Sequence, residues 1–219
     1  MPKTRIIVHL AILFVLTAFF WFPNSAVSSQ EFVNLFGYQE LSQNDMSYLP
    51  QWLNVLERHI TEDVPEGDCT DSFFNTCHLK KWFSFLESIK GQPVLVQIEA
   101  VNQYANKKTY VIDMDNYGME DYWAISREFF YNGGDCEDYA ITKFFSLQWL
   151  GFDMNAIRVV ILQDTNLRVA HAVLAVESGN DVVILDNQTK EVISHNDIAH
   201  YIPLFSVNRN QWWLHLPEM

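Results

Sequence analysis

The second half of the chain alternates runs of β-branched and aliphatic residues with short polar turns. Such runs stand at Ile157–Leu162, Val169–Val176, Val182–Leu185 and Tyr201–Ser206, and runs of this length and composition favour β-strands. The connections between them are too short for helical crossovers, with Ser194–His200 as the one segment that has room. We therefore expect a largely antiparallel sheet.

The first half of the chain instead places apolar residues at helical spacing. This pattern predicts helices over Pro50–Ile60, Leu79–Ile89 and Val94–Ala105, with proline- and glycine-containing stretches between them. Between the two halves, Thr109–Ile112 has the composition of a strand and Tyr122–Phe130 that of a short helix. The fold class that follows is α+β, a helical lobe packed against one twisted sheet.

A glycine pair, an acidic run and a lone cysteine open a further helix in the middle of the chain. Asp135 follows Gly133-Gly134 and is a favoured N-cap residue, and the apolar face of the helix continues to Gly151, where a helix often ends. Cys136 is then expected at the first helical position. Free backbone N–H groups and the helix dipole favour a negative charge there, so a thiolate at this place is a nucleophile.

A thiol nucleophile needs a base and a group that orients the base. His171 lies within an apolar run and Asp186 ends the next run. On adjacent antiparallel strands the two side chains would be neighbours, with one ring nitrogen bonded to the carboxylate and the other facing Cys136. Taken singly, a core histidine, a turn aspartate and a structural cysteine are ordinary features. The three together, on helix, strand and strand, predict a catalytic triad, with Asn187 as the alternative orienting residue.

Asp135, Glu137 and Asp138 surround Cys136 with carboxylates. Neighbouring negative charges raise the pKa of a thiol and disfavour the thiolate. A bound cation would offset this effect, and carboxylates so closely spaced are hard oxygen ligands of the kind that Ca²⁺ takes. The alternative is ordinary capping, because an acidic first turn stabilises a helix without any metal. The pattern is not an EF-hand, so further ligands must come from elsewhere in the chain.

The N-terminus predicts export. Lys3 and Arg5 precede an apolar run from Ile6 to Phe22, and Ala26-Val27-Ser28 offers small residues at the positions that a signal peptidase reads. We interpret residues 1–28 as a cleaved signal peptide and residues 29–219 as a single domain. An uncleaved membrane anchor is the alternative, because the apolar run is close to spanning length.

The charge and the cysteine content are consistent with a soluble protein outside the cytoplasm. The net charge of the chain is −13, and the signal segment contains no acidic residue, so its removal leaves a more acidic protein. This argues against nucleic acid and against docking on anionic lipid through general basicity. The chain has three cysteines. Cys69 and Cys77 are close enough for a local disulfide, which would leave Cys136 free; the alternative is that all three are reduced.

Over residues 94–208 the chain resembles the bacterial transglutaminase-like cysteine proteinases, specifically the LapG type of periplasmic adhesin-cleaving protease. The resemblance is carried by Val101-Asn102, Asn106, Tyr110-Val111, Asp113, Asp121-Tyr122-Trp123-Ala124, Gly134-Asp135-Cys136-Glu137-Asp138-Tyr139-Ala140-Ile141, Lys143, Leu150-Gly151, His171-x-Val173-Leu174, Leu185-Asp186-Asn187 and Phe205-Ser206-x-Asn208. The chain departs from the family pattern at Ala172, where the family often has methionine, and at Ile125, where it often has Thr-Pro.

The resemblance implies a papain-like, transglutaminase-like fold in which Cys136, His171 and Asp186 hydrolyse a peptide bond. It also implies calcium at Asp135 and Glu137, with Asp138 as a further candidate ligand. The implied substrate is the N-terminal region of a large cell-surface adhesin, whose cleavage in the periplasm would disperse a biofilm. The implied inhibitor is an inner-membrane cyclic-di-GMP receptor. The alternative functions are a transamidase with the same triad and a non-catalytic binding module.

Overall fold

The structure of the protein, a computed structural model, describes residues 34–63 and 77–217. Its sheet has the strand order β1-β7-β6-β2-β3-β4-β5, and each neighbouring pair is antiparallel. The strands are β1 (Gln39–Gln43), β2 (Ile157–Asp164), β3 (Val169–Ser178), β4 (Asp181–Leu185), β5 (Ile193–Ser194), β6 (Tyr201–Val207) and β7 (Trp212–Leu216).

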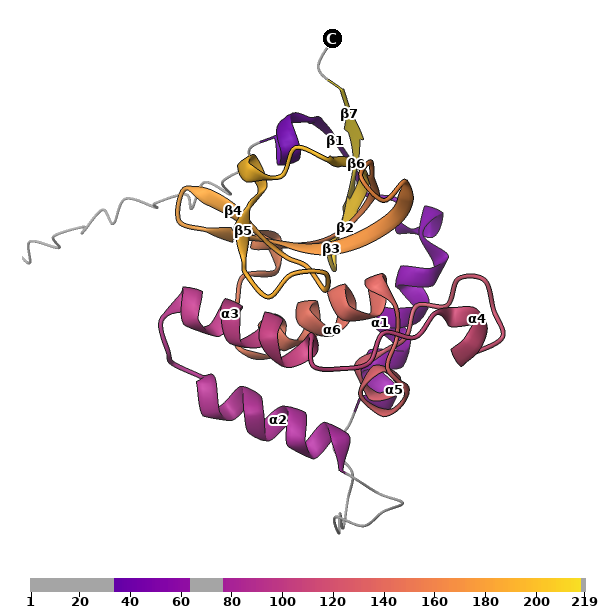
Figure 1. The fold of residues 1–219 in the computed structure, drawn as a ribbon, viewed down its shortest axis with the longest axis vertical. Helices are drawn as coiled ribbons and strands as arrows, with labels where there is room; N and C mark the ends of the chain where they lie inside the picture. The colour runs from indigo at the N-terminus through magenta and orange to yellow at the C-terminus, as the bar shows by residue number, and fades with distance from the viewer. Residues whose placement is uncertain (1–33, 64–76, 218–219) are drawn as a thin grey trace, which may run out of the picture. The chain divides into compact units, whose positions relative to one another are not determined.

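The helices form layers below this sheet. Figure 1 shows α3 and α6 next to the sheet and α2 on their far side. The α-helices of the described chain are α1 (Pro50–Glu62), α2 (His78–Ile89), α3 (Val94–Ala105), α4 (Asp113–Asn116), α5 (Ser126–Asn132) and α6 (Cys136–Trp149). The α+β class and the antiparallel sheet expected from the sequence are therefore confirmed. In the part of the chain that the structure describes, no helix combines the length and the apolar character needed to cross a membrane.

Two predicted elements differ from the structure. The strand predicted over Thr109–Ile112 is wrong: Tyr110 forms an isolated bridge to Gly134, and none of the described strands pairs with this segment. The helix predicted from Tyr122 begins only at Ser126. The preceding residues stay extended because the carboxylates of Asp113 and Asp138 accept their backbone N–H groups. The connection over residues 194–200, which was long enough for a helical crossover, contains a single 3₁₀ turn, His195–Asp197.

Two sequence expectations fall on residues without a described structure. The proposed signal peptide, residues 1–28, lies outside the described residues. Cys69, the expected partner of Cys77, also lies outside them, while Cys77 itself is disulfide-bonded. Cys136 is a free thiol.

The central strands are buried on both faces. Val159, Leu174 and Leu185 join the core that lies between sheet and helices. The alternate residues Val160 and Val173 pack on the opposite face, in a smaller cluster that also contains Leu35, Ala175, Ile184 and Tyr201. Burial on two faces explains why these strands are continuous apolar runs in the sequence and do not alternate with polar residues.

Helix α6 is the centre of the larger core. Every residue from Glu137 to Leu147 is buried, and the helix packs on β2 and β3 on one side and on α3 and α5 on others. The chain enters α6 through Gly133, whose φ of 81° favours glycine, and Gly134, where a Cβ atom would collide with the Asp138 carboxylate. This packing fixes Cys136 relative to the sheet.

Asp63 connects α1 to the start of α5. Its carboxylate accepts the backbone N–H groups of Ser126 and Arg127 at 3.2 and 2.7 Å and lies 2.8 Å from His59 Nδ1. The first N–H groups of a helix have no partner within that helix. We expect Asp63→Ala to lower the free energy of unfolding by about 1–3 kcal/mol, because it leaves these donors unpaired.

Chemical denaturation measures this loss. The control is Asp45→Ala, which removes a cap from an exposed 3₁₀ turn through Ser47 N–H and is expected to cost much less. Equal losses in the two variants would contradict the capping role of Asp63.

Candidate active site

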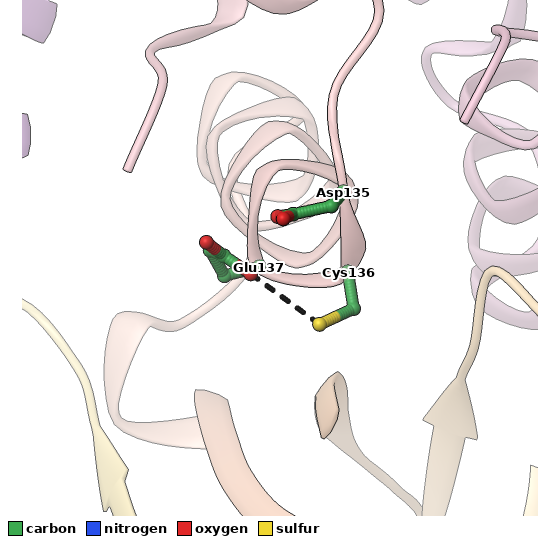
Figure 2. Close-up of side chains that lie close together, drawn as sticks. All are labelled: Asp135, Cys136 and Glu137. Carbon is green, nitrogen blue, oxygen red and sulfur yellow. Dashed lines mark hydrogen bonds between the residues drawn. The ribbon is translucent and has the colours of Figure 1, made fainter. Parts of the chain in front are cut away.

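Cys136 occupies the first position of α6, with Asp135 as the N-cap residue. Figure 2, which looks along the helix, shows its thiol beside Glu137, with Sγ 3.3 Å from Oε2. Burial, followed by the charges of Glu137 and Asp135, raises the pKa of the Cys136 thiol well above its ordinary value, and the backbone N–H of Ala172 lowers it in part. With its carboxylates uncompensated, this site therefore holds a thiol and not a thiolate.

His171 on β3 and Asp186 after β4 form a buried pair. The distance from His171 Nε2 to Asp186 Oδ1 is 3.0 Å, and each residue is 3% exposed. This is the contact between histidine and aspartate that the sequence predicts. Because Nε2 is bonded to the carboxylate, Nδ1 is the ring nitrogen left for a proton transfer.

Asp186 is held as a carboxylate by several donors. Burial alone would raise its pKa, but hydrogen bonds from His171, from the backbone N–H of Gln188 and from the hydroxyl of Tyr201 bring the pKa below its ordinary value. The Tyr201 hydroxyl lies 2.5 Å from Oδ2. A carboxylate with this many donors stays ionised and fixed in place.

The start of α6 meets β3 next to His171. Helix α6 packs on β3, and the backbone N–H of Ala172, the residue that follows the histidine, lowers the pKa of the thiol. In the described part of the chain, the Cys136 side chain donates its hydrogen bond to Glu137 and makes none to the imidazole. The structure thus brings the histidine and the aspartate together and places the cysteine at the adjacent residue of the same strand.

Helix α3 and strand β6 position the aspartate loop. Asn106 Nδ2 donates to the carbonyl oxygens of Asp186 and Thr189 at 2.7 and 2.8 Å, which ties the loop to the end of α3. Tyr201 at the start of β6 binds the carboxylate itself. Reasoning from the sequence missed the role of Tyr201, although a tyrosine in a buried strand needs a partner for its hydroxyl.

A cluster of carboxylates lies next to Cys136. Possible ligand atoms of Asp113, Asp121 and Glu137 lie within 4.8 Å of one another, and so do those of Asp113, Asp135 and Asp138. Asp113 Oδ1 and Asp135 Oδ1 are buried and have no hydrogen-bond partner among the described residues. The sequence predicted that further ligands must come from elsewhere in the chain but did not say which. Asp113 and Asp121 are candidates for these ligands.

The carboxylates of this cluster repel one another. Burial, together with Asp135, raises the pKa of Glu137 to about 10, and burial raises that of Asp113 to about 6. An all-oxygen donor set with unpaired buried atoms fits a hard cation such as Ca²⁺, which would relieve the repulsion.

Asp138 differs from the other acids of the cluster. Its Oδ1 accepts the N–H of Ala124 at 2.7 Å, and its Oδ2 accepts the N–H of Asp135 at 3.2 Å. Burial raises its pKa well above the ordinary value. Asp138 thus anchors two backbone segments of the site, and Asp113 offers a freer oxygen for a metal.

A thiol at a helix start beside a buried histidine–aspartate pair is the arrangement of a cysteine protease. The comparisons with known proteins support this class. Residues 69–219 match the family described as bacterial transglutaminase-like cysteine proteinase BTLCP, and the chain belongs to this family. The chain is therefore a cysteine protease of the LapG type with a papain-like α+β fold.

Solved structures of one bacterial protein are similar to the chain. Legionella pneumophila LapG is 28% identical, with a TM-score of 0.59, covering 73% of this chain and 87% of that chain. Calcium-bound LapG of the same organism gives 27% identity, a TM-score of 0.58 and coverages of 74% and 86%. The EGTA-treated form is 28% identical, with a TM-score of 0.59, covering 73% of this chain and 84% of that chain. No curated protein matches the chain.

The Tyr201 hydroxyl gives a testable prediction. Tyr201→Phe removes a donor from the ionised form of Asp186, which raises the pKa of that carboxyl. We expect the free energy of unfolding at neutral pH to fall by about 1–3 kcal/mol. Because the Asp186 pKa is depressed in the folded protein, this deficit should shrink as the pH falls through the native pKa.

Urea unfolding at several pH values measures this effect. Tyr48→Phe is the control, because Tyr48 is 72% exposed. A deficit that is constant with pH would show that the lost energy does not come from the Asp186 carboxylate.

Proposed function

We propose that the protein is an exported calcium-dependent cysteine endopeptidase with Cys136 as nucleophile, His171 as acid and base, and Asp186 as the residue that orients the imidazole. The observation that carries this proposal is the buried hydrogen bond between His171 and Asp186. His171 lies on β3, and the next residue of that strand, Ala172, is close to Cys136 at the start of α6. Membership of a cysteine proteinase family supports it.

The proposed reaction has two stages. Cys136 Sγ attacks the carbonyl carbon of the scissile peptide bond while its proton passes to His171, and His171 then gives this proton to the leaving amine. Water, deprotonated by His171, next attacks the thioester carbonyl; the C–S bond breaks, the acid product leaves, and Cys136 Sγ regains its proton from His171. Asp186 accepts from Nε2–H throughout, which keeps Nδ1 available for both transfers.

The N-terminus of α6 also provides a place for the developing oxyanion. The backbone N–H of Cys136 is at the first helical position and has no partner within the helix. A well-placed donor of this kind contributes about 3 kcal/mol of transition-state stabilisation.

Asp113, Asp135 and Glu137 are the proposed calcium ligands, with Asp121 and Asp138 next to them. The ion would supply the positive charge that these acids lack, which lowers the pKa of the neighbouring thiol. Coordination by Glu137 would also remove the acceptor to which the thiol now donates. The calcium-bound form of the similar Legionella pneumophila LapG supports this proposal.

The calcium site predicts a gain in thermal stability. We expect added Ca²⁺ to stabilise the protein by about 2.7 kcal/mol when its concentration is 100 times the Kd, and by less at pH 5 than at pH 7.5, because the ligands must lose their protons. Asp113→Asn should weaken this effect. Asp115→Asn, an exposed neighbour outside the cluster, should leave it unchanged.

Thermal unfolding with and without Ca²⁺ measures the binding, and activity in excess EGTA measures the dependence. Full activity in excess EGTA would remove the calcium proposal. Equal responses of the two variants to Ca²⁺ would remove Asp113 as a ligand.

The resemblance described above supports a particular substrate, location and partner. We propose that the enzyme acts in the periplasm on the N-terminal region of a large cell-surface adhesin and thereby promotes biofilm dispersal. An inner-membrane cyclic-di-GMP receptor is the proposed inhibitor. The apolar N-terminal segment supports export, and the acidic net charge is consistent with a protein substrate and no nucleic acid.

Co-expression with adhesin fragments tests this function. We expect the wild-type protein to cut the adhesin fragment, so that mass spectrometry finds a new N-terminus on the fragment. With Cys136→Ala we expect no cleavage. Asp186→Asn should slow cleavage by roughly 10²- to 10⁴-fold, since the imidazole loses the partner that fixes its tautomer. Asp115→Asn serves as the active control.

One outcome would replace the hydrolase with its alternative. Incorporation of a labelled amine into a glutamine peptide, with no peptide bond cut, would identify a transamidase that uses the same triad.

A further inference from the structure

Gln188 contacts the buried pair of His171 and Asp186 through both its backbone and its side chain. Its backbone N–H donates to Asp186 Oδ1 at 2.9 Å, and the end of its side-chain amide lies 3.3 Å from His171 Nε2. His171 and Asp186 are buried, whereas Gln188 is exposed. The glutamine is therefore the exposed member of a group of three residues whose other two members are the proposed base and its orienting acid.

The loop that carries Gln188 is held on both sides. Asn106 at the end of α3 donates from Nδ2 to the backbone oxygens of Asp186 and Thr189, at 2.7 and 2.8 Å. The backbone of Gln188, between these two residues, is itself bonded to the Asp186 carboxylate. An exposed glutamine side chain loses rotational freedom when it folds back onto its own loop, so its contact with the imidazole needs a compensating interaction.

The imidazole of His171 is held by its other neighbours. Nε2 lies 3.0 Å from Asp186 Oδ1, and the ring meets the Tyr201 ring edge-on, with 5.7 Å between the two centroids. Tyr201 also donates its hydroxyl to Asp186. With the ring held in this way, Nε2 has two polar neighbours among the described residues, the Asp186 carboxylate and the Gln188 amide.

These two neighbours determine how the amide must face the ring. An ionised carboxylate only accepts, so His171 Nε2 carries a proton and donates it to Asp186, in the shorter and charge-assisted contact of the two. An amide nitrogen only donates and cannot bond to a protonated ring nitrogen. A half-turn of the amide puts its oxygen in the same place, and the hydrogen-bond partners decide between the two orientations. The partner here is an N–H donor, which selects the oxygen.

We propose that Gln188 is a positioning residue of the active site, whose side-chain oxygen shares the Nε2–H of His171 with Asp186. This inference rests on the triad proposed above. When the Cys136 thiol gives its proton to His171, the imidazole becomes positively charged, and a second acceptor at Nε2 stabilises this charged form. Gln188 thus acts on the reaction through the imidazole.

The test follows the titration of His171 by NMR in the full chain with Ca²⁺ present. It uses the Cys136→Ala background, where no thiol titrates beside the ring, and the signals are identified by their absence after His171→Ala. Gln188→Met keeps the length and the backbone bond but has no acceptor, and Gln188→Glu keeps an acceptor. The control is Gln103→Met, the same change at an exposed glutamine of α3.

We expect Gln188→Met to lower the pKa of the imidazole by roughly half a unit to one unit, which corresponds to the loss of one hydrogen bond of ordinary strength. Gln188→Glu should restore the pKa or raise it, and Gln103→Met should leave it unchanged. With Cys136 present, Gln188→Met should react with iodoacetamide at pH 7 roughly threefold to tenfold more slowly than the wild type. Its unfolding temperature should stay at the wild-type value, because the backbone contact is kept.

Three results would overturn the inference. An unchanged imidazole pKa in Gln188→Met would show that the side chain does not act on the ring, and a raised pKa would show that its amide donates and does not accept. A lowered pKa that Gln188→Glu fails to restore, together with a lower unfolding temperature in both variants, would show a purely structural residue.

Alkylation of His171→Ala separates failure of this inference from failure of the triad. If His171→Ala reacts with iodoacetamide at the wild-type rate, the imidazole does not activate the thiol and the triad itself is wrong. If His171→Ala reacts slowly while Gln188→Met behaves like the wild type in both measurements, the triad stands and only the role of Gln188 is removed.

Discussion

The buried carboxylate of Asp138 holds together parts of the site that are distant in the sequence. It binds the N–H of Ala124, ahead of α5, and the N–H of Asp135, at the start of α6. Its position also explains Gly134, since any side chain there would occupy the same space. The loop with Asp113 and Asp121 and the helix with Cys136 therefore keep a fixed relation. Both the thiol and the carboxylate cluster depend on this single buried acid.

The site uses one chemical group, the carboxylate, in two opposite environments. Asp186 is surrounded by donors from His171, Gln188 and Tyr201, and its pKa is depressed. Glu137 and Asp113 are surrounded by other acids, and their pKa values are raised. The surroundings, and not the side chain, decide which acid stays ionised unaided and which needs a cation. Cys136 lies between the two environments, so its reactivity depends on both.

Local patterns in the sequence predicted most of the fold. The helices over residues 50–105 and the four central strands are found within two residues of their predicted ends, because apolar spacing and β-branched runs reflect burial directly. Strand β1 was missed because it is a short edge strand of mostly polar residues, and β7 was missed because it has only five residues, although it is paired on both sides. The strand predicted at Thr109–Ile112 failed because its apolar side chains face solvent or Gly133, with no strand beside them.

The candidate site was predictable only in part. Cys136, His171 and Asp186 could be recognised in the sequence because each is unusual for its segment, and because their order along the chain is compatible with a catalytic triad. Asp113 and Asp121 carry no such signal, since acids in a polar loop are ordinary and only the tertiary structure brings them to Glu137.

The sheet joins the two ends of the described chain. Among the described strands, β1 pairs only with β7. Glu40 on β1 forms an ion pair with Arg158 on β2, whose guanidinium stacks over Trp213. The earliest strand therefore has nowhere to attach until residues up to Leu216 have been synthesised. A polypeptide that is still being synthesised lacks this closure, so the sheet is completed only after the C-terminal strand is free to pair.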